Sequence, residues 1–314
     1  MLGYALRRLL ATVPTLLIVA VSVFAIMRLV PGDPAVLLLG DSADADQLRD
    51  IRQSMGLDRP MPVQLFLWLQ HALSGDLGRS TVNGQPVLPL ILDRFAVTAQ
   101  IVLAAVTAAV AIALPLGMLA ALKQDRATDV GIVAAATLLL SMPSFWLGLL
   151  LLLVFGVWLK WVPVVGYVPF GEDPWGAFRA LILPVVTLTL IEIGVLTRMV
   201  RATTIDVLRL DYMAHARAKG LPEWLVLRRH ALPNAFAPTL TLIGVILGNL
   251  LGGIAVIETV FTLPGLGRLL VDAIFARDYP VVQGVMLFVA VLYVLINLLV
   301  DLAYPLFDPR VAME

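Results

Sequence analysis

The residue types that usually carry out catalysis are scarce and scattered in this chain. Its three histidines are His71, His215 and His230, and cysteine is absent. Neither the H-E-x-x-H pattern of a zinc hydrolase nor the G-x-S-x-G pattern of a serine hydrolase occurs. The G-x-x-x-x-G-K-[ST] loop that cradles nucleotide phosphates is absent as well. We therefore expect a chain that is not an enzyme by itself and binds no metal, no cofactor and no nucleic acid.

Three carboxylates lie within or at the ends of apolar segments, where a charge is costly and usually faces a partner or a water-filled cavity. Glu192 lies well inside its segment. This position favours a lining role along a polar pathway, and a structural pairing with a neighbouring helix is the alternative. Glu258 and Asp301 lie near the ends of their segments, where a side chain reaches the interface at lower cost, so we expect structural roles for both.

A polar and basic stretch, residues 211–238, separates two long apolar segments and reads DYMAHARAKGLPEWLVLRRHALPNAFAP. Its three alanines before Gly220 favour a helix, and Gly220 with Pro222 ends that helix before a second short amphipathic one. Small side chains at such an elbow allow another protein's backbone to approach closely. We expect Pro233 and Pro238 to break or restart the chain after the elbow. The alternative is an ordinary basic loop attracted to anionic lipid.

The elements that must position these residues are membrane-spanning helices. With 60% hydrophobic and 14% charged residues and a mean hydropathy of +0.95, the chain exceeds what water-soluble domains carry. Pro143 lies inside an apolar run that is too long for one upright helix, which predicts a kink or a segment along the interface. The sequence predicts an all-α integral membrane protein with about six transmembrane helices, at residues 9–27, 97–122, 130–159, 181–197, 236–257 and 281–300.

Six crossings place both termini on one side of the membrane. Twelve basic residues would share that side, whereas the other side mixes its basic residues with more acids. The positive-inside rule makes the first side the cytoplasm. Arg7 and Arg8 precede the first apolar run, so a cleaved or twin-arginine export signal is the alternative for this segment. The run is longer than a usual signal core and no small-x-small cleavage site follows it, which favours an uncleaved helix.

Turn signals and apolar runs divide the chain into four parts. Residues 1–30 form an N-terminal transmembrane helix, and residues 31–94 form an extracytoplasmic region with short amphipathic helices at 45–55 and 63–73. Residues 95–304 form the transmembrane core, with a cytoplasmic loop at 205–235, and residues 305–314 form a cytoplasmic tail. The extracytoplasmic region is either a structured cap or a docking surface for an outside partner, and both interpretations stay open.

The 211–238 stretch resembles the cytoplasmic EAA signature of importer-type ABC permeases, in which E-A-A, three residues, Gly and nine residues precede I-x-L-P. Ala216, Gly220, Leu232 and Pro233 fall at the matching spacing. DYMAHARAKGL followed by RHALPNAFAP is the form typical of the peptide-importer branch. The segments MRLVPGDPA, MGLDRP, SGDLGRS, SMPSFWLGLLLLLVF, IETVFTLPGLGRLL and RDYPVVQG extend the resemblance over nearly the whole chain. The sequence departs from the general pattern at Ala214, His215 and His230.

The resemblance implies the type I ABC importer permease fold in a bacterial or archaeal cell membrane. It also implies a second homologous permease, two ATP-binding subunits that hold ATP and Mg²⁺, and an extracytoplasmic solute-binding protein. The implied cargo is short peptides, and nickel, glutathione or oligosaccharides are alternatives for the same machinery. An ion-coupled secondary transporter is the alternative from a different class. The implied ATPase-coupling residues are Ala216, Arg217, Lys219, Gly220, Leu221, Leu232 and Pro233.

Overall fold

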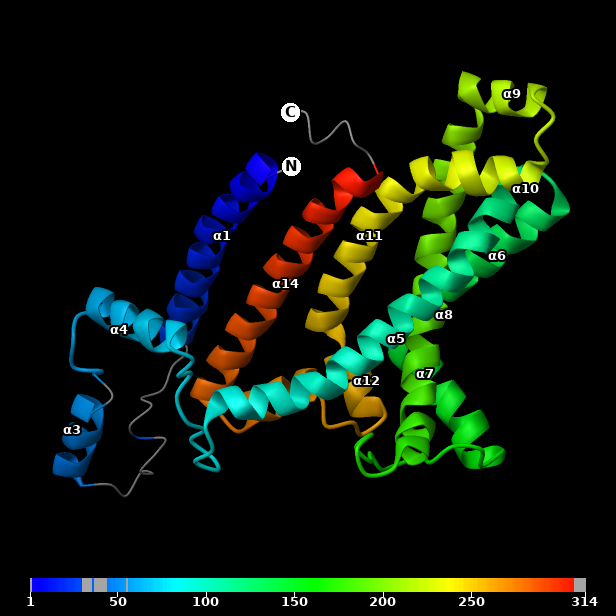
Figure 1. Ribbon diagram of the computed structural model, residues 1–314. Coiled ribbons are helices and arrows are strands. Elements are labelled where there is room, and N and C mark those ends of the chain that lie inside the picture. Colours follow the sequence, from blue (N-terminus) through cyan, green and yellow to red (C-terminus); the bar gives the residue numbers. More distant parts are fainter. Residues whose placement is uncertain (1, 30–35, 37–43, 55, 308–314) are drawn as a thin grey trace.

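The computed structural model describes residues 2–29, 36, 44–54 and 56–307 (Figure 1). Apart from one isolated bridge between Arg79 and Pro86, the regular secondary structure of these residues is helical. The first half contains α1 (Leu2–Leu29), α3 (Ala45–Ser54), α4 (Met61–Leu73), α5 (Val87–Leu122), α6 (Ala127–Ser141), α7 (Ser144–Leu151) and the π-helix η1 (Leu152–Trp158). The second half contains α8 (Pro174–Leu208), α9 (Asp211–Ala218), α10 (Glu223–Val226), the π-helix η2 (Leu227–Ala231), α11 (Leu232–Gly253), α12 (Ala255–Val260), α13 (Leu266–Phe275) and α14 (Tyr279–Phe307).

The membrane-spanning helices agree with the apolar runs of the sequence. Among the described residues, five helices are long and apolar enough to cross a bilayer, and α6 with the α7–η1 segment makes a sixth if this bent pair is one span. The pair bends by 98°, next to Pro143, which has extended backbone angles and precedes α7. Proline disfavours the helical conformation of the residue before it, and the expected interruption at Pro143, as a kink or as a segment along the interface, is confirmed.

The core of the bundle lies where α5 and α8 pack side by side. Ala105, Ala109 and Ala113 on α5 are fully buried, and larger side chains such as Leu196 of α8 fill the space between the helices. A side chain added at Gly117 would lie 2.7 Å from Val200, so only glycine allows the two backbones to approach this closely. Helix α11 packs on this pair and then on α14.

The peripheral helix α1 packs on α14 (Figure 1). Near one end of this pair, the Arg8 guanidinium lies 2.9 Å from the Asp301 carboxylate. Both side chains are partly exposed, so the ion pair itself contributes at most about 1 kcal/mol. Asp301 therefore has the structural role that its position near a helix end predicts.

The opposite end of the bundle is fixed by a buried carboxylate. Glu258 is fully buried and accepts hydrogen bonds from the Thr98 hydroxyl (2.6 Å) and the Arg268 backbone N–H (2.9 Å). The Thr98 hydroxyl in turn accepts one from the Leu266 N–H (2.8 Å). These bonds attach α12 and the start of α13 to α5, which confirms the structural role expected for Glu258. Nearby, the Ser80 hydroxyl and the Thr81 N–H donate to the Asp278 carboxylate, which joins the region before α5 to the start of α14.

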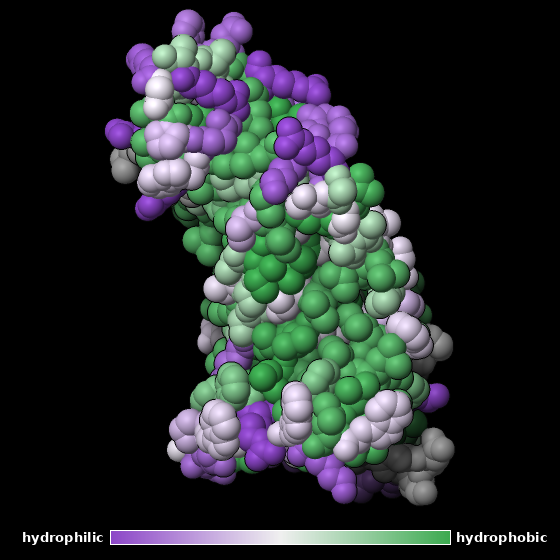
Figure 2. All heavy atoms as spheres, turned by 90° about the vertical axis from the view of Figure 1, so that its right-hand side faces the viewer, coloured by the Kyte–Doolittle hydropathy of each residue, from purple (hydrophilic) through white to green (hydrophobic). Residues whose placement is uncertain are grey.

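The surface has the layering of a membrane protein. Figure 2 shows a broad hydrophobic band between two hydrophilic ends. The beginning of α1, the end of α14 and the α9–α10 segment lie at the same end in Figure 1. Helices α3 and α4 lie at the other end and correspond to the short helices expected at 45–55 and 63–73, although Met55 is outside the described residues. Most of 31–43 and of the 305–314 tail is also outside them.

Candidate functional site

The candidate site is the elbow, which we define as residues 211–233, from the start of α9 to Pro233. Helix α9 ends at Ala218, and Gly220 follows with a φ of +76°. This left-handed conformation is strained for residues with a Cβ atom, so a glycine is needed where the chain turns. Pro222 then precedes α10, with φ fixed near the value that starts a helix. The expectation that two short helices meet at Gly220 is confirmed.

An ion pair joins the two arms of the elbow. The Arg217 Nη2 lies 2.8 Å from the Glu223 Oε1, and the Arg217 Nε lies 3.2–3.3 Å from both carboxylate oxygens. Both side chains are more than a third exposed, so this pair orients the arms more than it stabilises the fold. Arg217 is therefore engaged within the elbow, whereas Lys219 is exposed on its outer face.

The inner face of the elbow is an apolar cluster. Met213 of α9 is fully buried, and Ala216, one turn further along, is 6% exposed. They pack with Val226 of α10 and with residues at the end of α8 and in η2, and Met118 and Leu122 of α5 cover the cluster. The elbow therefore continues the hydrophobic core toward this end of the bundle. Ala216 faces inward, so of the three alanines Ala214 and Ala218 are the ones that offer the small accessible side chains expected at the elbow.

The outer face is exposed and combines small side chains with one lysine and one aromatic residue. Ala214, Ala218, Lys219 and Gly220 are exposed, and a side chain added at Gly220 would meet nothing within 4 Å. Trp224 is 61% exposed, which suits a contact surface, although Trp158, Trp161 and Trp175 are equally exposed and tryptophan also favours the membrane interface. Leu221 is half-buried and packs on the inner cluster.

The remaining two predicted residues, Leu232 and Pro233, lie at the start of α11. Leu232 is half-buried and Pro233 is exposed. The chain does not break here, because α10, η2 and α11 form one helical run from Glu223 to Gly253. The π-helical turn at Leu227–Ala231 ends two residues before Pro233, whose ring and missing N–H disturb regular α-helical bonding. Regular α-helix restarts at Leu232 with Pro233 in its first turn, as expected, whereas Pro238 lies inside α11 and does not interrupt it.

A buried ion pair beneath the elbow was not predicted. The Arg201 guanidinium of α8 donates two hydrogen bonds to the Asp129 carboxylate of α6, at 2.5 and 2.6 Å, and the Asp125 N–H donates a third at 2.9 Å. Asp129 is almost fully buried. The partners are 72 residues apart in sequence, so no local pattern reveals them. The pair fixes α6 to α8 about two turns before α8 ends at Leu208.

Glu192 lies elsewhere, within the membrane-spanning part of α8. It is only 9% exposed, and no hydrogen bond or ion pair joins it to another residue of the described part of the chain. A buried carboxylate without a partner is costly, which is typical of a residue kept for function. The pathway-lining role of Glu192 stays a prediction.

The chain is similar to known transport proteins along its whole length. Residues 113–313 match the family described as "Binding-protein-dependent transport system inner membrane component", and residues 1–102 match the corresponding N-terminal family. A proposed peptide transport system permease of Brucella abortus (strain 2308) is 46% identical over 314 residues, which cover 100% of both chains. The glutathione transport system permease of Salmonella choleraesuis (strain SC-B67) is 44% identical, over 99% of both chains.

A solved amino acid ABC transporter is 18% identical, with a TM-score of 0.47, over 71% of this chain and 94% of that one. Both family matches and the full-length relatives agree with the multi-pass helical architecture. Proteins of this kind are inner-membrane permeases that work with ATPase and substrate-binding partners and have no ATPase site of their own. The chain thus belongs to the family of binding-protein-dependent transport system inner membrane components and is a permease subunit of an ABC importer with the type I fold.

Proposed function

We propose that this permease forms part of the translocation path for short peptides, which a solute-binding protein delivers from outside. One relative's name refers to peptides, which supports this cargo. Import of glutathione, which another relative's name gives, of nickel or of oligosaccharides by the same machinery is the alternative for the cargo. Membership of a binding-protein-dependent family disfavours the ion-coupled secondary transporter.

The assembly that we propose contains this chain, a second homologous permease and two ATP-binding subunits, which hold ATP and Mg²⁺. Both termini and the 205–235 loop face the cytoplasm. The common location of α1's beginning, α14's end and the elbow supports this orientation, as do the exposed basic residues there (Figure 1). The extracytoplasmic region before α5 then lies on the side where the solute-binding protein arrives.

The elbow couples the ATPase to the helices in this proposal. Its outer face, with Lys219 and Gly220, docks on one ATP-binding subunit, and its inner face is packed on α5 and α8. Because the inner cluster is close-packed, a displacement of the elbow moves the ends of these helices with it. ATP binding then changes the relative stability of inward-open and outward-open arrangements through the contacts that differ between them.

This proposal rests on the two faces of the elbow. One face is buried against the membrane core, and the other is exposed. Affinity purification of the tagged chain in mild detergent from its host, with mass spectrometry and an ATPase assay, tests it. We expect recovery of a second permease and one or two kinds of ATPase subunit. Recovery of the chain alone, together with vesicle uptake that follows an ion gradient and ignores ATP, would contradict it.

A further inference from the structure

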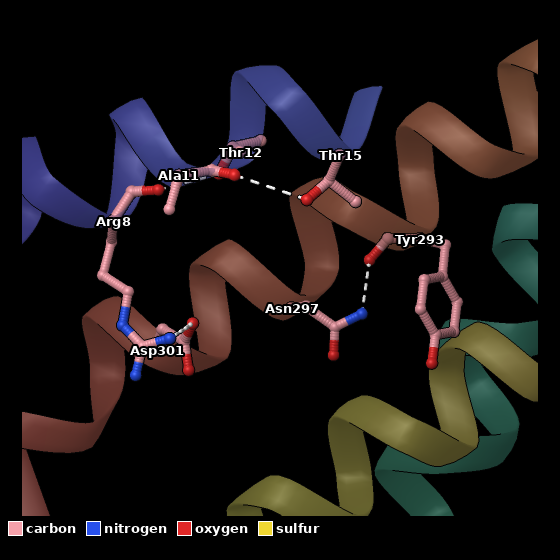
Figure 3. Close-up of polar contacts among 7 residues, drawn as sticks. All are labelled: Arg8, Ala11, Thr12, Thr15, Tyr293, Asn297 and Asp301. Atoms are coloured by element: carbon pink, nitrogen blue, oxygen red, sulfur yellow. Dashed lines mark hydrogen bonds and ion pairs between the residues drawn. The ribbon is translucent and has the colours of Figure 1, made fainter. Parts of the chain in front are cut away.

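A second feature of the molecule lies on the opposite side of α11 from the core, where α1, α11 and α14 together line a groove of about 680 Å³. The Arg8–Asp301 ion pair lies at one end of the groove, and Leu266 and Leu270 of α13 lie at the other. Between these ends the wall is mainly aliphatic. Figure 3 shows Arg8, Thr12 and Thr15 on α1 opposite Asp301, Asn297 and Tyr293 on α14.

The polar groups along the groove are already used within their own helices. The hydroxyls of Thr12 and Thr15 donate to backbone carbonyls one turn earlier, at 3.0 and 3.3 Å. The Asn297 Nδ2 likewise donates to the Tyr293 carbonyl at 2.8 Å (Figure 3). The groove therefore presents mostly hydrocarbon to an occupant, which fits an apolar chain better than a polar solute.

The length of the groove does not suit a transmembrane helix lying within it. Along α14 it extends from Val285 to Asp301, which is about 24 Å at about 1.5 Å per residue. A spanning helix needs about 30 Å and free passage at both ends, whereas α13 ends the groove.

One basic residue lies in excess beside the open end of the groove, because Arg8 pairs with Asp301 in the groove lining and Arg7 adds a further positive charge next to it. Arg8 is 47% exposed despite its ion pair, and Arg7 beside it is exposed, with no hydrogen bond or ion pair to the described residues. Both lie where α1 begins, at the end of the bundle that carries the elbow (Figure 1). Basic groups beside a cavity between transmembrane helices are suited to the phosphate of an anionic lipid headgroup.

We propose that the groove between α1, α11 and α14 binds one anionic phospholipid, with an acyl chain along Thr15 and Gly252 and the phosphate at Arg7 and Arg8. The lipid fills the space that α1 leaves beside the core and joins this peripheral helix to α11 and α14. This inference is independent of the transported cargo and of the elbow.

Gly252 gives a variant that fills the groove without changing charge. A side chain added there meets nothing within 4 Å, and Gly252 lies in the groove wall. Gly131 on α6 is the matched control, because it is also an exposed helical glycine with open space but is not among the groove residues. The transporter complex is purified from vesicles of equal phosphatidylglycerol and phosphatidylcholine, and retained lipids are counted by native mass spectrometry.

We expect phosphatidylglycerol to be retained in preference to phosphatidylcholine by the parent and by Gly131→Leu, and to be lost from Gly252→Leu. Arg7→Gln should weaken the preference about fivefold, the effect of one basic residue near the headgroups. Equal retention by Gly252→Leu and Gly131→Leu, or no preference for the anionic lipid, would overturn the proposal.

A direct contact experiment separates lipid from protein occupants. The chain has no cysteine, so Thr15→Cys gives a single attachment point for a benzophenone photo-crosslinker. Illumination of the assembled transporter in the same vesicles should add the mass of phosphatidylglycerol. An adduct with the second permease instead would show that a protein covers the groove, and this result would also overturn the proposal.

Discussion

The replacement of Gly220 by glutamate tests the coupling role of the elbow most sharply. Gly220 has a φ of +76°, so any side chain adds backbone strain of about 1–2 kcal/mol. The space around it is open in the isolated chain, so a glutamate side chain meets no atom of its own protein. Docked against an ATP-binding subunit as proposed, the same carboxylate would be buried without a partner. Such burial costs at least about 2 kcal/mol, which weakens binding about 30-fold or more.

Two further variants separate this docking effect from strain. Gly220→Ala adds the strain without the bulk or charge, and we expect it to retain the ATPase subunits within about fivefold of the parent. Gly84→Glu is the matched control at the other end of the molecule, because Gly84 has a φ of +69° and equally open surroundings. It should retain the ATPase subunits fully.

The assay is co-purification of ATPase subunits with the tagged permease in detergent, followed by ATPase stimulation and uptake in proteoliposomes. Gly220→Glu should reach the membrane in normal amounts and lose both ATPase binding and uptake. Normal ATPase retention with normal uptake would refute the reasoning, and equal losses in Gly84→Glu would show that strain alone is responsible.

Four more variants test the buried polar groups. Glu192→Gln should change transport rate or selectivity in proteoliposomes more than abundance in the membrane. Equal losses of transport and of abundance would show that Glu192 has a structural role instead. Asp129→Asn leaves Arg201 without its counter-charge and should lower the free energy of unfolding by about 3–5 kcal/mol, measured as a fall in Tm in detergent. The double variant Asp129→Leu with Arg201→Met should recover at least half of that loss, and no recovery would mean that the charges have a role beyond mutual compensation. Glu258→Gln should cost about 1–3 kcal/mol by the same measurement, because an amide N–H₂ faces donors that need an acceptor, and an unchanged Tm would contradict the bonding described for Glu258.

The sequence predicts best those features that a few neighbouring residues determine. Continuous apolar runs locate the spanning helices, Pro143 locates the bend, and Gly220 locates the turn of the elbow. The sequence did not predict how far the spanning helices extend. Helix α5 begins at Val87 rather than at residue 97, and α8 runs over Pro174–Leu208 rather than 181–197. Hydropathy marks only the part of a helix within hydrocarbon, and these helices continue with polar residues beyond it.

Features that depend on tertiary packing were outside the reach of sequence patterns. The Asp129–Arg201 pair requires α6 and α8 to be neighbours, and charge counting alone assigns Arg201 to a cytoplasmic surface. The direction of Ala216 depends on where α9 packs against the core, so its spacing from Gly220 did not show that its methyl group is buried. Spacing defined the elbow, and packing determined which of its residues are accessible to a partner.

The most direct test of the central claim is a photo-crosslink from the outer face of the elbow. Ala214 is exposed there, and Ala214→Cys carrying a benzophenone should form a covalent adduct with an ATP-binding subunit in the assembled transporter. Asn83→Cys, exposed near the opposite end, is the control and should form none. We predict an ATPase adduct at residue 214 whose yield changes when ATP is added. Adducts with lipid alone at residue 214, with or without ATP, would contradict the coupling role of the elbow.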